Sequence, residues 1–252
     1  MEAEPCILTD PPPPADARKP YGAYPSQFVD FRYPSEPEAK PLVIMIHGGF
    51  WRARYDLQHA GHLCAALTAG GFPTANIEYR RTGEPGGGWP GTFEDVKQAI
   101  QFARDQAGEP RTIVIGHSAG GHLALWVAAE IPDLAAVIAL APVASLHQDL
   151  SNHAACEFMG GTPAEFPDRY AYADPARPTA VPRIILHGDA DDIVPIELSQ
   201  AYSAPSNLTE LPGATHFDLI DPHSPAYRVL LQQLQPSPGR AANPGRSRFS
   251  NG

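Results

Sequence analysis

RTIVIGHSAGGHLALWVAAE, residues Arg111–Glu130, is the stretch from which the fold of this chain can be predicted. Thr112–Ile115 is a short apolar, β-branched run, which is typical of a buried strand. Gly116–Gly120 follows as G-x-S-x-G, and Gly121–Ala129 is apolar nearly all round, as in a helix that packs against a sheet. Strand, glycine-flanked serine and helix are the context of a nucleophile elbow, a sharp turn that exposes the serine hydroxyl above a sheet.

The G-x-S-x-G motif is short, and in a chain with 22 glycines it can also arise in an ordinary turn. The strand before it and the apolar helix after it favour the catalytic interpretation. The N-terminus of that helix would direct free N–H groups toward negative charge at the serine. A catalytic serine also needs a base, an orienting acid and an oxyanion hole, which must come from elsewhere in the chain.

Composition limits the classes of protein to which this chain can belong. The chain has 252 residues, 43% of them hydrophobic, which suits one globular domain with a sizeable core. Its formal net charge of −10 argues against nucleic acid or an anionic membrane as partner. Three scattered cysteines without C-x-x-C fit a reducing compartment. Because there is no signal-peptide pattern and no run of ~20 apolar residues, we expect a cytoplasmic protein.

Proline content marks the expected domain boundaries. Residues 1–20, which include Pro11–Pro14, predict a proline-rich N-terminal arm. Residues 236–252 predict a disordered tail, and 21–235 a single domain between the two. Residues 142–182 are irregular and too long for a simple connection, so we expect a small cap or specificity loop there.

Hydrophobic periodicity predicts alternating strands and helices. The strands are expected at 27–33, 42–46, 72–79, 112–115, 135–141, 183–186 and 208–211. The helices are expected at 55–69, from 92 onward, at 121–129, 196–203 and 222–234. This alternation implies an α/β fold with a mostly parallel central sheet and helices on both faces.

Two loops after predicted strands carry the remaining chemistry. His187–Pro195, HGDADDIVP, holds three aspartates, and Gly213–Phe217, GATHF, holds His216. Alternating carboxylates can bind calcium, but the loop lacks the twelve-residue pattern and closing glutamate of an EF-hand. Ser118, an aspartate of this loop and His216 stand in the chain order Ser…Asp…His of a hydrolase triad.

The roles follow from chemistry. A serine hydroxyl is too weakly acidic to attack unaided, so His216 would take the proton of Ser118. Gly49 and Phe50, in the HGGFW sequence after a buried strand, and Ala119 would offer backbone N–H groups to an oxyanion. No H-E-x-x-H metal motif and no phosphate-binding glycine loop occurs, so neither metal nor cofactor is expected.

Several motifs together resemble the α/β-hydrolase superfamily, over about residues 28–234. They are HGGFW (47–51), EYRR (78–81), WPGTFEDV (89–96), GHSAGGHLA (116–124), HGDADDIVP (187–195) and GATH (213–216). The resemblance implies the α/β-hydrolase fold, with a small cap or insert after the strand at 135–141. The superfamily pattern HG-x-x-D-x-x-VP selects Asp191 over Asp189 and Asp192 as the triad acid.

The motifs point to two branches of the superfamily. HGGFW and the histidine before the serine resemble the kynurenine formamidases. Tyr79-Arg80 and the following loop resemble the YR-L-A-P-E segment of the hormone-sensitive-lipase-like esterases, whose large N-terminal cap is missing here. The substrate class is therefore open between the two.

Aromatic residues near the predicted site would suit an aryl or short acyl substrate, although aromatics also commonly build cores. The candidate substrate-binding residues are Trp51, Tyr55, Trp89, His117 and Phe158, with Phe50 beside them. We expect a serine hydrolase of small carboxylic esters, or of an aryl formamide such as N-formylkynurenine. Its partner would be that small molecule, with no nucleic acid and no membrane, and a homodimer is left open. The alternative from another class is a non-catalytic ligand-binding protein with the same fold.

Overall fold

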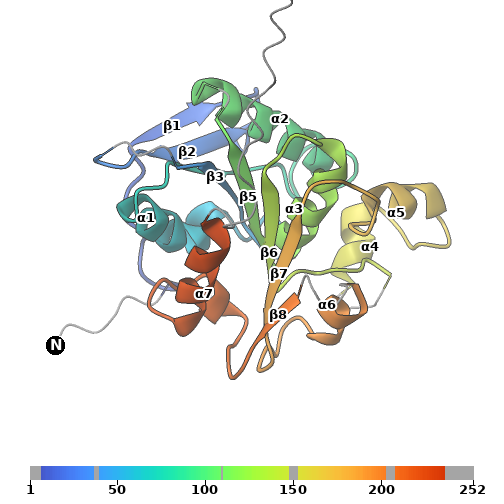
Figure 1. Ribbon diagram of the computed structural model, residues 1–252. Coiled ribbons are helices and arrows are strands. Elements are labelled where there is room, and N and C mark those ends of the chain that lie inside the picture. Colours follow the sequence, from blue (N-terminus) through green and yellow to red (C-terminus); the bar gives the residue numbers. More distant parts are fainter. Residues whose placement is uncertain (1–6, 37–39, 109, 148–152, 203–207, 236–252) are drawn as a thin grey trace, which may run out of the picture.

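A single mixed sheet forms the centre of the molecule. The computed structural model describes residues 7–36, 40–108, 110–147, 153–202 and 208–235, so the predicted tail at 236–252 and the start of the arm lie outside the described residues. Within these ranges the sheet has eight strands in the order β1-β2-β4-β3-β5-β6-β7-β8 (Figure 1). The strands are β1 (Ala17–Pro20), β2 (Phe28–Arg32), β3 (Leu42–Ile46), β4 (Thr74–Ile77), β5 (Thr112–His117), β6 (Ala136–Leu140), β7 (Arg183–Gly188) and β8 (Leu208–Leu211).

The pairing matches the expected topology. β1–β2 and β2–β4 are antiparallel, and every later neighbouring pair is parallel. A mostly parallel sheet must be covered on both faces, because its strands are apolar on both sides. The predicted α/β-hydrolase architecture is confirmed.

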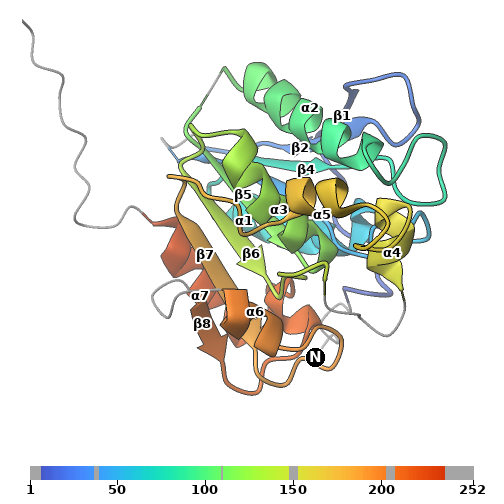
Figure 2. The same ribbon diagram turned by 90° about the vertical axis from the view of Figure 1, so that its right-hand side faces the viewer.

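Helices cover both faces (Figures 1 and 2). The helices are α1 (Gly61–Ala69), α2 (Gly91–Gln106), α3 (Ala119–Glu130), α4 (Ala154–Met159), α5 (Pro167–Ala173), α6 (Glu197–Tyr202), α7 (Pro225–Leu234) and the 3-10 turns η1 (Leu57–Ala60) and η2 (Phe217–Leu219). α1 and α7 pack on one face, while α2, α3 and α6 pack on the other, with α4 and α5 beside α3. In the described part of the chain, no helix is both long and apolar enough to span a membrane.

The alternation of side chains along β3 divides the core in two. All five residues of β3, LVIMI, are buried. Leu42, Ile44 and Ile46 belong to the core under α2 and α3, whereas Val43 and Met45 belong to the core under α1 and α7. Successive strand residues point to opposite faces, so a continuous apolar run serves both cores.

The N-terminal arm differs from its prediction. Residues 17–20 of the expected arm form β1, the edge strand next to β2, and Ile7 is buried in the core under α1 and α7. β1 has the sequence ARKP and an alternating, half-exposed burial pattern, so it carries no apolar run that could reveal it. An edge strand is held by backbone pairing with its one neighbour, here β2, and needs little apolar surface of its own.

Candidate active site

Ser118 occupies the turn between β5 and α3. Its backbone has φ 57° and ψ −119°, a left-handed conformation that costs energy for a residue with a Cβ and is maintained here by the surrounding structure. Gly120 allows the turn to approach β3, because a Cβ there would lie 2.2 Å from the carbonyl oxygen of Ile46. Only 3% of the surface of Ser118 is exposed. The predicted strand–turn–helix geometry is therefore present.

His216 pairs with one aspartate of the acidic loop. Its Nδ1 lies 2.7 Å from Oδ2 of Asp191, whose side chain is fully buried. Asp189 instead accepts a hydrogen bond from the N–H of Gly213, and Asp192 is exposed. The three carboxylates thus have different surroundings, and Asp191, the residue selected by the motif, is the one at His216.

Asp191 is surrounded by donors. Besides His216, its Oδ2 has Nε2 of His187 at 3.2 Å, and its Oδ1 accepts from the N–H groups of Ile193 and Val194 at 2.9 and 2.8 Å. Burial by itself would raise the pKa of Asp191, but hydrogen bonds from His187, His216 and Val194 outweigh burial and hold that pKa well below its ordinary value. The carboxylate is therefore ionised and acts as an acceptor for the N–H of His216.

Ser118 and His216 face one pocket of about 610 Å³. It is lined by Leu8, Gly49, Phe50, Arg54, Tyr55, Asp56, Gln58, His59, His117, Ser118, Ile193, His216 and Phe217. Among the described residues no hydrogen bond joins the side chains of Ser118 and His216. Such contacts are commonly long before substrate binds. Because Nδ1 of His216 is engaged by Asp191, Nε2 is the ring nitrogen left to receive a proton.

The loop after β3 turns sharply beside Ser118. Gly49, Phe50 and Trp51 have φ values of 102°, 55° and 54°, three left-handed residues in a row. A Cβ on Gly48 would lie 2.9 Å from the carbonyl oxygen of His117 and 3.0 Å from Cβ of Ser118, so this loop packs closely against the elbow. Within the described ranges, no acceptor is found for the N–H groups of Gly49, Phe50 or Ala119.

Comparison with known proteins shows which families and solved structures the chain resembles. The BD-FAE family model matches residues 29–134, and the Esterase family model matches residues 94–182. Esterase B from Lactobacillus rhamnosis, solved with a phosphonate inhibitor, superposes with a TM-score of 0.73 at 22% identity, over 90% of this chain and 87% of that one. A truncated carbohydrate esterase from gut microbiota also gives 0.73 at 22% identity, over 88% and 97% of the two chains. The superpositions on these two esterases agree with the α/β-hydrolase fold of the chain.

Two curated relatives of the chain are an esterase and a kynurenine formamidase. Esterase LipQ of Mycobacterium tuberculosis is 31% identical over 71% of this hydrolase-fold chain, which spans about half (51%) of LipQ. Kynurenine formamidase avaC of Aspergillus versicolor is 27% identical over 74% of the chain and 83% of its own length. The names of these relatives denote an esterase and a formamide hydrolase.

Two of the five predicted substrate-binding residues, Tyr55 and His117, line the pocket with Ser118. Trp51 and Phe158 do not, because they stack on each other in the core with ring centroids 4.7 Å apart and are fully buried. Trp89 packs against Phe93 in a separate depression between α2 and α5. The prediction that these three aromatics line the pocket is wrong.

The segment 142–182 was expected to cap the site, and its described residues do not. α4 and α5, which it contains, pack beside α3, and no described residue of the segment lines the pocket of Ser118. Phe158 anchors α4 through the stack with Trp51. An insert whose aromatics are used in the core cannot also present them to a ligand.

Three histidines near the site, His117, His59 and His122, are neutral. Burial, followed by the charges of His216 and His59, lowers the pKa of His117 well below its ordinary value. Neutral His117 donates from Nε2 to the backbone oxygen of His216, 3.1 Å away, and so braces the loop that carries it. Burial, followed by the charge of His47, lowers the pKa of His59 to about 3. His122, with its pKa lowered by burial to about 4, bonds the carbonyl of Ala173 in the core.

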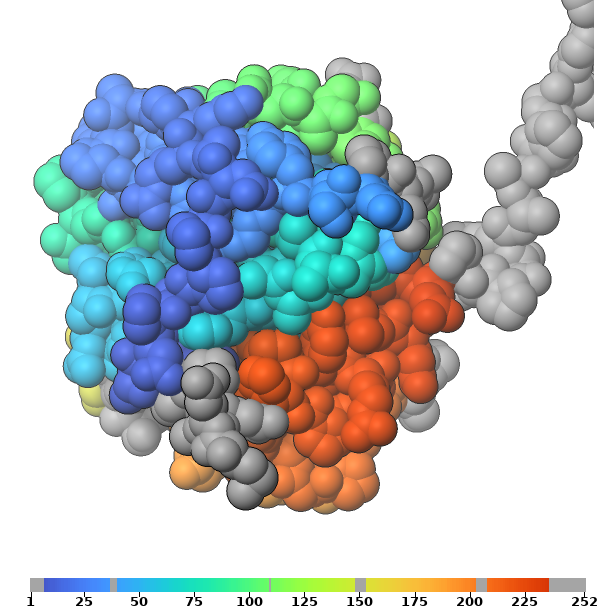
Figure 3. All heavy atoms as spheres, turned by 90° about the vertical axis from the view of Figure 1, so that its left-hand side faces the viewer, coloured from blue at the N-terminus to red at the C-terminus, as the bar shows by residue number. Residues whose placement is uncertain are grey.

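The N-terminal arm supplies a pocket residue that sequence reasoning missed. Leu8 is 54% exposed and lines the pocket, next to buried Ile7. Figure 3 shows the arm running across the surface over the start of α1, where Pro12 packs against Gly61. His62 bonds the carbonyl of Asp10 there, with 3.1 Å between the atoms. No local pattern in a proline-rich arm indicates such a role.

Proposed function

We propose that this protein is a serine hydrolase that cleaves small carboxylic esters through an acyl-enzyme on Ser118. The observation that carries the proposal is the pairing of His216 with buried, ionised Asp191 at a pocket that also contains the strained turn of Ser118. Serine, histidine and a buried acid in this relation are the groups that acyl transfer requires. The similarity to esterases supports the same chemistry.

The mechanism follows from the atoms available. Nε2 of His216 takes the hydroxyl proton of Ser118 while Oγ bonds the acyl carbon, and Asp191 stabilises the resulting imidazolium. The oxyanion would accept from the N–H groups of Gly49, Phe50 and Ala119, each typically worth ~3 kcal/mol of barrier. His216 then returns the proton to the leaving alcohol, and water activated in the same way releases the acid.

The pocket favours a small substrate with an apolar group. Phe50, Tyr55, Phe217, Ile193 and Leu8 provide apolar surface around Ser118. A pocket of about 610 Å³ suits a short acyl or aryl group rather than a long lipid chain. Recognition would come from burial of that group, and the charged side chains of Arg54 and Asp56, which also line the pocket, would select its polar end.

Hydrolysis of N-formylkynurenine is a second candidate. It is favoured by the similarity to kynurenine formamidase avaC, which this chain matches over 83% of that relative's length. The same steps apply, with a formyl group transferred to Ser118 and an aryl amine in place of the alcohol.

Turnover of p-nitrophenyl acetate and of N-formylkynurenine by the wild type and Ser118→Ala tests these proposals. Serine-dependent hydrolysis of the ester alone supports an esterase, whereas much higher kcat/KM on formylkynurenine supports a formamidase. If the wild type is inert on both and a fluorophosphonate probe leaves Ser118 unlabelled, the catalytic proposal fails. A non-catalytic ligand-binding role would then replace it.

A further inference from the structure

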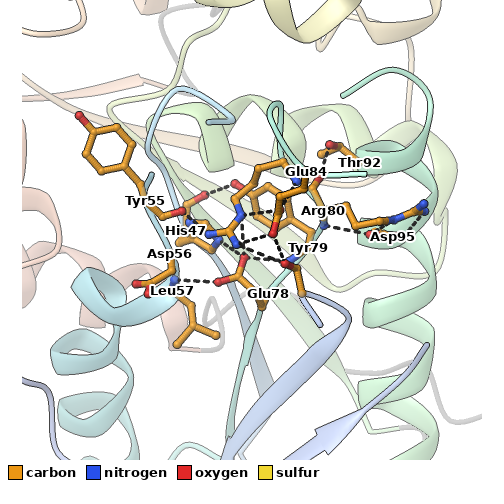
Figure 4. A network of polar contacts seen from close by, with 12 residues as sticks. His47, Tyr55, Asp56, Leu57, Glu78, Tyr79, Arg80, Glu84, Thr92 and Asp95 are labelled. Atoms are coloured by element: carbon orange, nitrogen blue, oxygen red, sulfur yellow. Dashed lines mark hydrogen bonds and ion pairs between the residues drawn. The ribbon is translucent and has the colours of Figure 1, made fainter. Parts of the chain in front are cut away.

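His47, the first residue of HGGFW, uses both nitrogens of its buried ring. Nε2 lies 2.8 Å from Oε1 of Glu78 (Figure 4). Nδ1 lies 2.8 Å from the carbonyl oxygen of Gly48. The side chains of His47 and Glu78 are 0% and 2% exposed. Because a carbonyl oxygen can only accept, Nδ1 must carry a proton.

Glu78 decides the state of the other nitrogen. Its Oε1 accepts from the N–H of Tyr79 at 3.0 Å, and its Oε2 accepts from the N–H of Leu57 at 3.1 Å. Both oxygens therefore already face obligatory backbone donors, which favours the ionised carboxylate. An ionised Glu78 requires Nε2 of His47 to donate as well, so His47 is an imidazolium paired with a carboxylate.

Other charged groups surround this pair. Nε of Arg81 lies 3.5 Å from Oε1 of Glu78 and 3.0 Å from Glu84, so Arg81 is shared by two carboxylates. Asp56, near the start of η1, has its pKa lowered against burial by bonds from Gln58 and by the charge of His47. Arg81 and Glu84 carry opposite charges, and Asp56 adds one further negative charge that interacts with His47.

The bond from His47 to Gly48 has a consequence at the reaction centre. The carbonyl of Gly48 and the N–H of Gly49 belong to one planar trans peptide, so they point in opposite directions. Holding the carbonyl against the ring of His47 therefore sets the direction of the Gly49 N–H. The hydroxyl of Tyr79 holds the preceding peptide in the same way, by donating to the carbonyl of His47 at 2.8 Å.

We propose that Glu78 is a positioning residue for the oxyanion hole, because it keeps His47 doubly protonated and thereby orients the Gly48–Gly49 peptide beside Ser118. Glu78 lies just after β4 and contacts none of the reacting atoms. The inference rests on the proposed serine-hydrolase function and deepens it. It assigns the EYRR motif a role at the site in addition to packing.

Glu78→Gln tests the kinetic consequence. An amide cannot accept from His47, Tyr79 and Leu57 together, since one of its two ends is a donor. We expect kcat on p-nitrophenyl acetate to fall by roughly 10- to 100-fold, part of the loss seen when an oxyanion donor is removed, with KM changed less than about twofold. The matched control is Glu84→Gln, which also loses a bond to Arg81 but does not touch His47, and should retain kcat within about threefold.

A rise in KM at unchanged kcat, or equal losses in the two variants, would overturn the proposal. A separate measurement keeps it testable if Glu78→Gln does not fold. In ¹⁵N-histidine NMR spectra of the wild type at pH 7, His47 should show two protonated ring nitrogens, assigned by their absence in His47→Gln. One unprotonated nitrogen on His47 would refute the inference, whereas absent hydrolysis by the wild type would refute the proposed function.

Discussion

Gly116 and Gly120 touch across the nucleophile turn. A Cβ atom on Gly116 would lie 2.1 Å from the carbonyl oxygen of Gly120, a distance that real side chains do not adopt. The two glycines of G-x-S-x-G therefore allow the end of β5 and the first turn of α3 to meet around Ser118. Both positions are constrained by space, since neither has a positive φ.

Gly116→Ala is consequently expected to destabilise the fold. The new methyl must displace backbone, and overpacking of this kind typically lowers the free energy of unfolding by about 1–3 kcal/mol or more. Gly108→Ala is the control, because Gly108 has a φ of 77° but no atom within 4 Å of its would-be Cβ. Urea unfolding of both variants measures the difference. An equal or greater loss in Gly108→Ala would show that space at position 116 is not the constraint.

Replacing the aspartates of the acidic loop one at a time should separate their roles. Asp191→Asn is expected to lower kcat by about 10⁴-fold, because the amide can no longer hold His216 in the tautomer that accepts a proton at Nε2. Asp189→Asn and Asp192→Asn should change kcat only a few-fold. Steady-state kinetics on p-nitrophenyl acetate provide the measurement. Similar losses in all three variants would contradict the assignment of Asp191.

Alanine substitutions of Phe158 and Tyr55 should have opposite effects, the first mainly on stability and the second mainly on KM. Phe158→Ala removes a buried ring stacked on Trp51 and is expected to lower the free energy of unfolding by about 3–5 kcal/mol, with little effect on KM. Tyr55→Ala opens the pocket wall and should raise KM several-fold at a smaller cost in stability. Thermal unfolding and KM for an aryl ester test the pair. A large KM change in Phe158→Ala would show that Phe158 does line the pocket.

Leu8 should influence the length of acyl group that the pocket accepts. Leu8→Ala enlarges the pocket and is expected to shift the best p-nitrophenyl ester toward longer chains, while Leu8→Trp should shift it toward acetate. One methylene in an apolar pocket is worth about 1–3 kcal/mol, so the ratios of kcat/KM should move roughly 10-fold or more. The same ranking of esters in both variants and the wild type would show that Leu8 does not contact the acyl group.

Buried His122 predicts a pH dependence of stability. Burial lowers its pKa to about 4 from an ordinary value of 6.5, so the unfolded chain takes up this proton first as the pH falls. The free energy of unfolding should therefore decrease from about pH 6.5 toward pH 4, by up to ~1.4 kcal/mol per unit from this group. His122→Gln should show a smaller slope than the wild type in urea titrations at pH 7, 6 and 5. Identical slopes for the wild type and His122→Gln would refute this assignment.

Local patterns were enough to predict most of the scaffold. The apolar runs at 42–46 and 112–115 lie in buried strands, and Gly116–Gly120 forms the turn that its spacing indicates. Such features depend on residues within one element, where periodicity and glycine placement record the physical requirement directly. The relation of His216 to Asp191 was also predicted, but through motif resemblance rather than local pattern.

The identity of the pocket wall was decided by the tertiary structure alone. Trp51 and Tyr55 lie four positions apart in an aromatic stretch, yet one enters the core and the other lines the pocket. Leu8 reaches the pocket of Ser118 from the far end of the chain, and Glu78 reaches His47 from a neighbouring strand. The sequence by itself determined the buried strands, the helices that cover them and the nucleophile turn, but not the edge strand β1. Which side chains meet at the site depended on how distant segments pack, because such contacts produce no periodic pattern in the sequence.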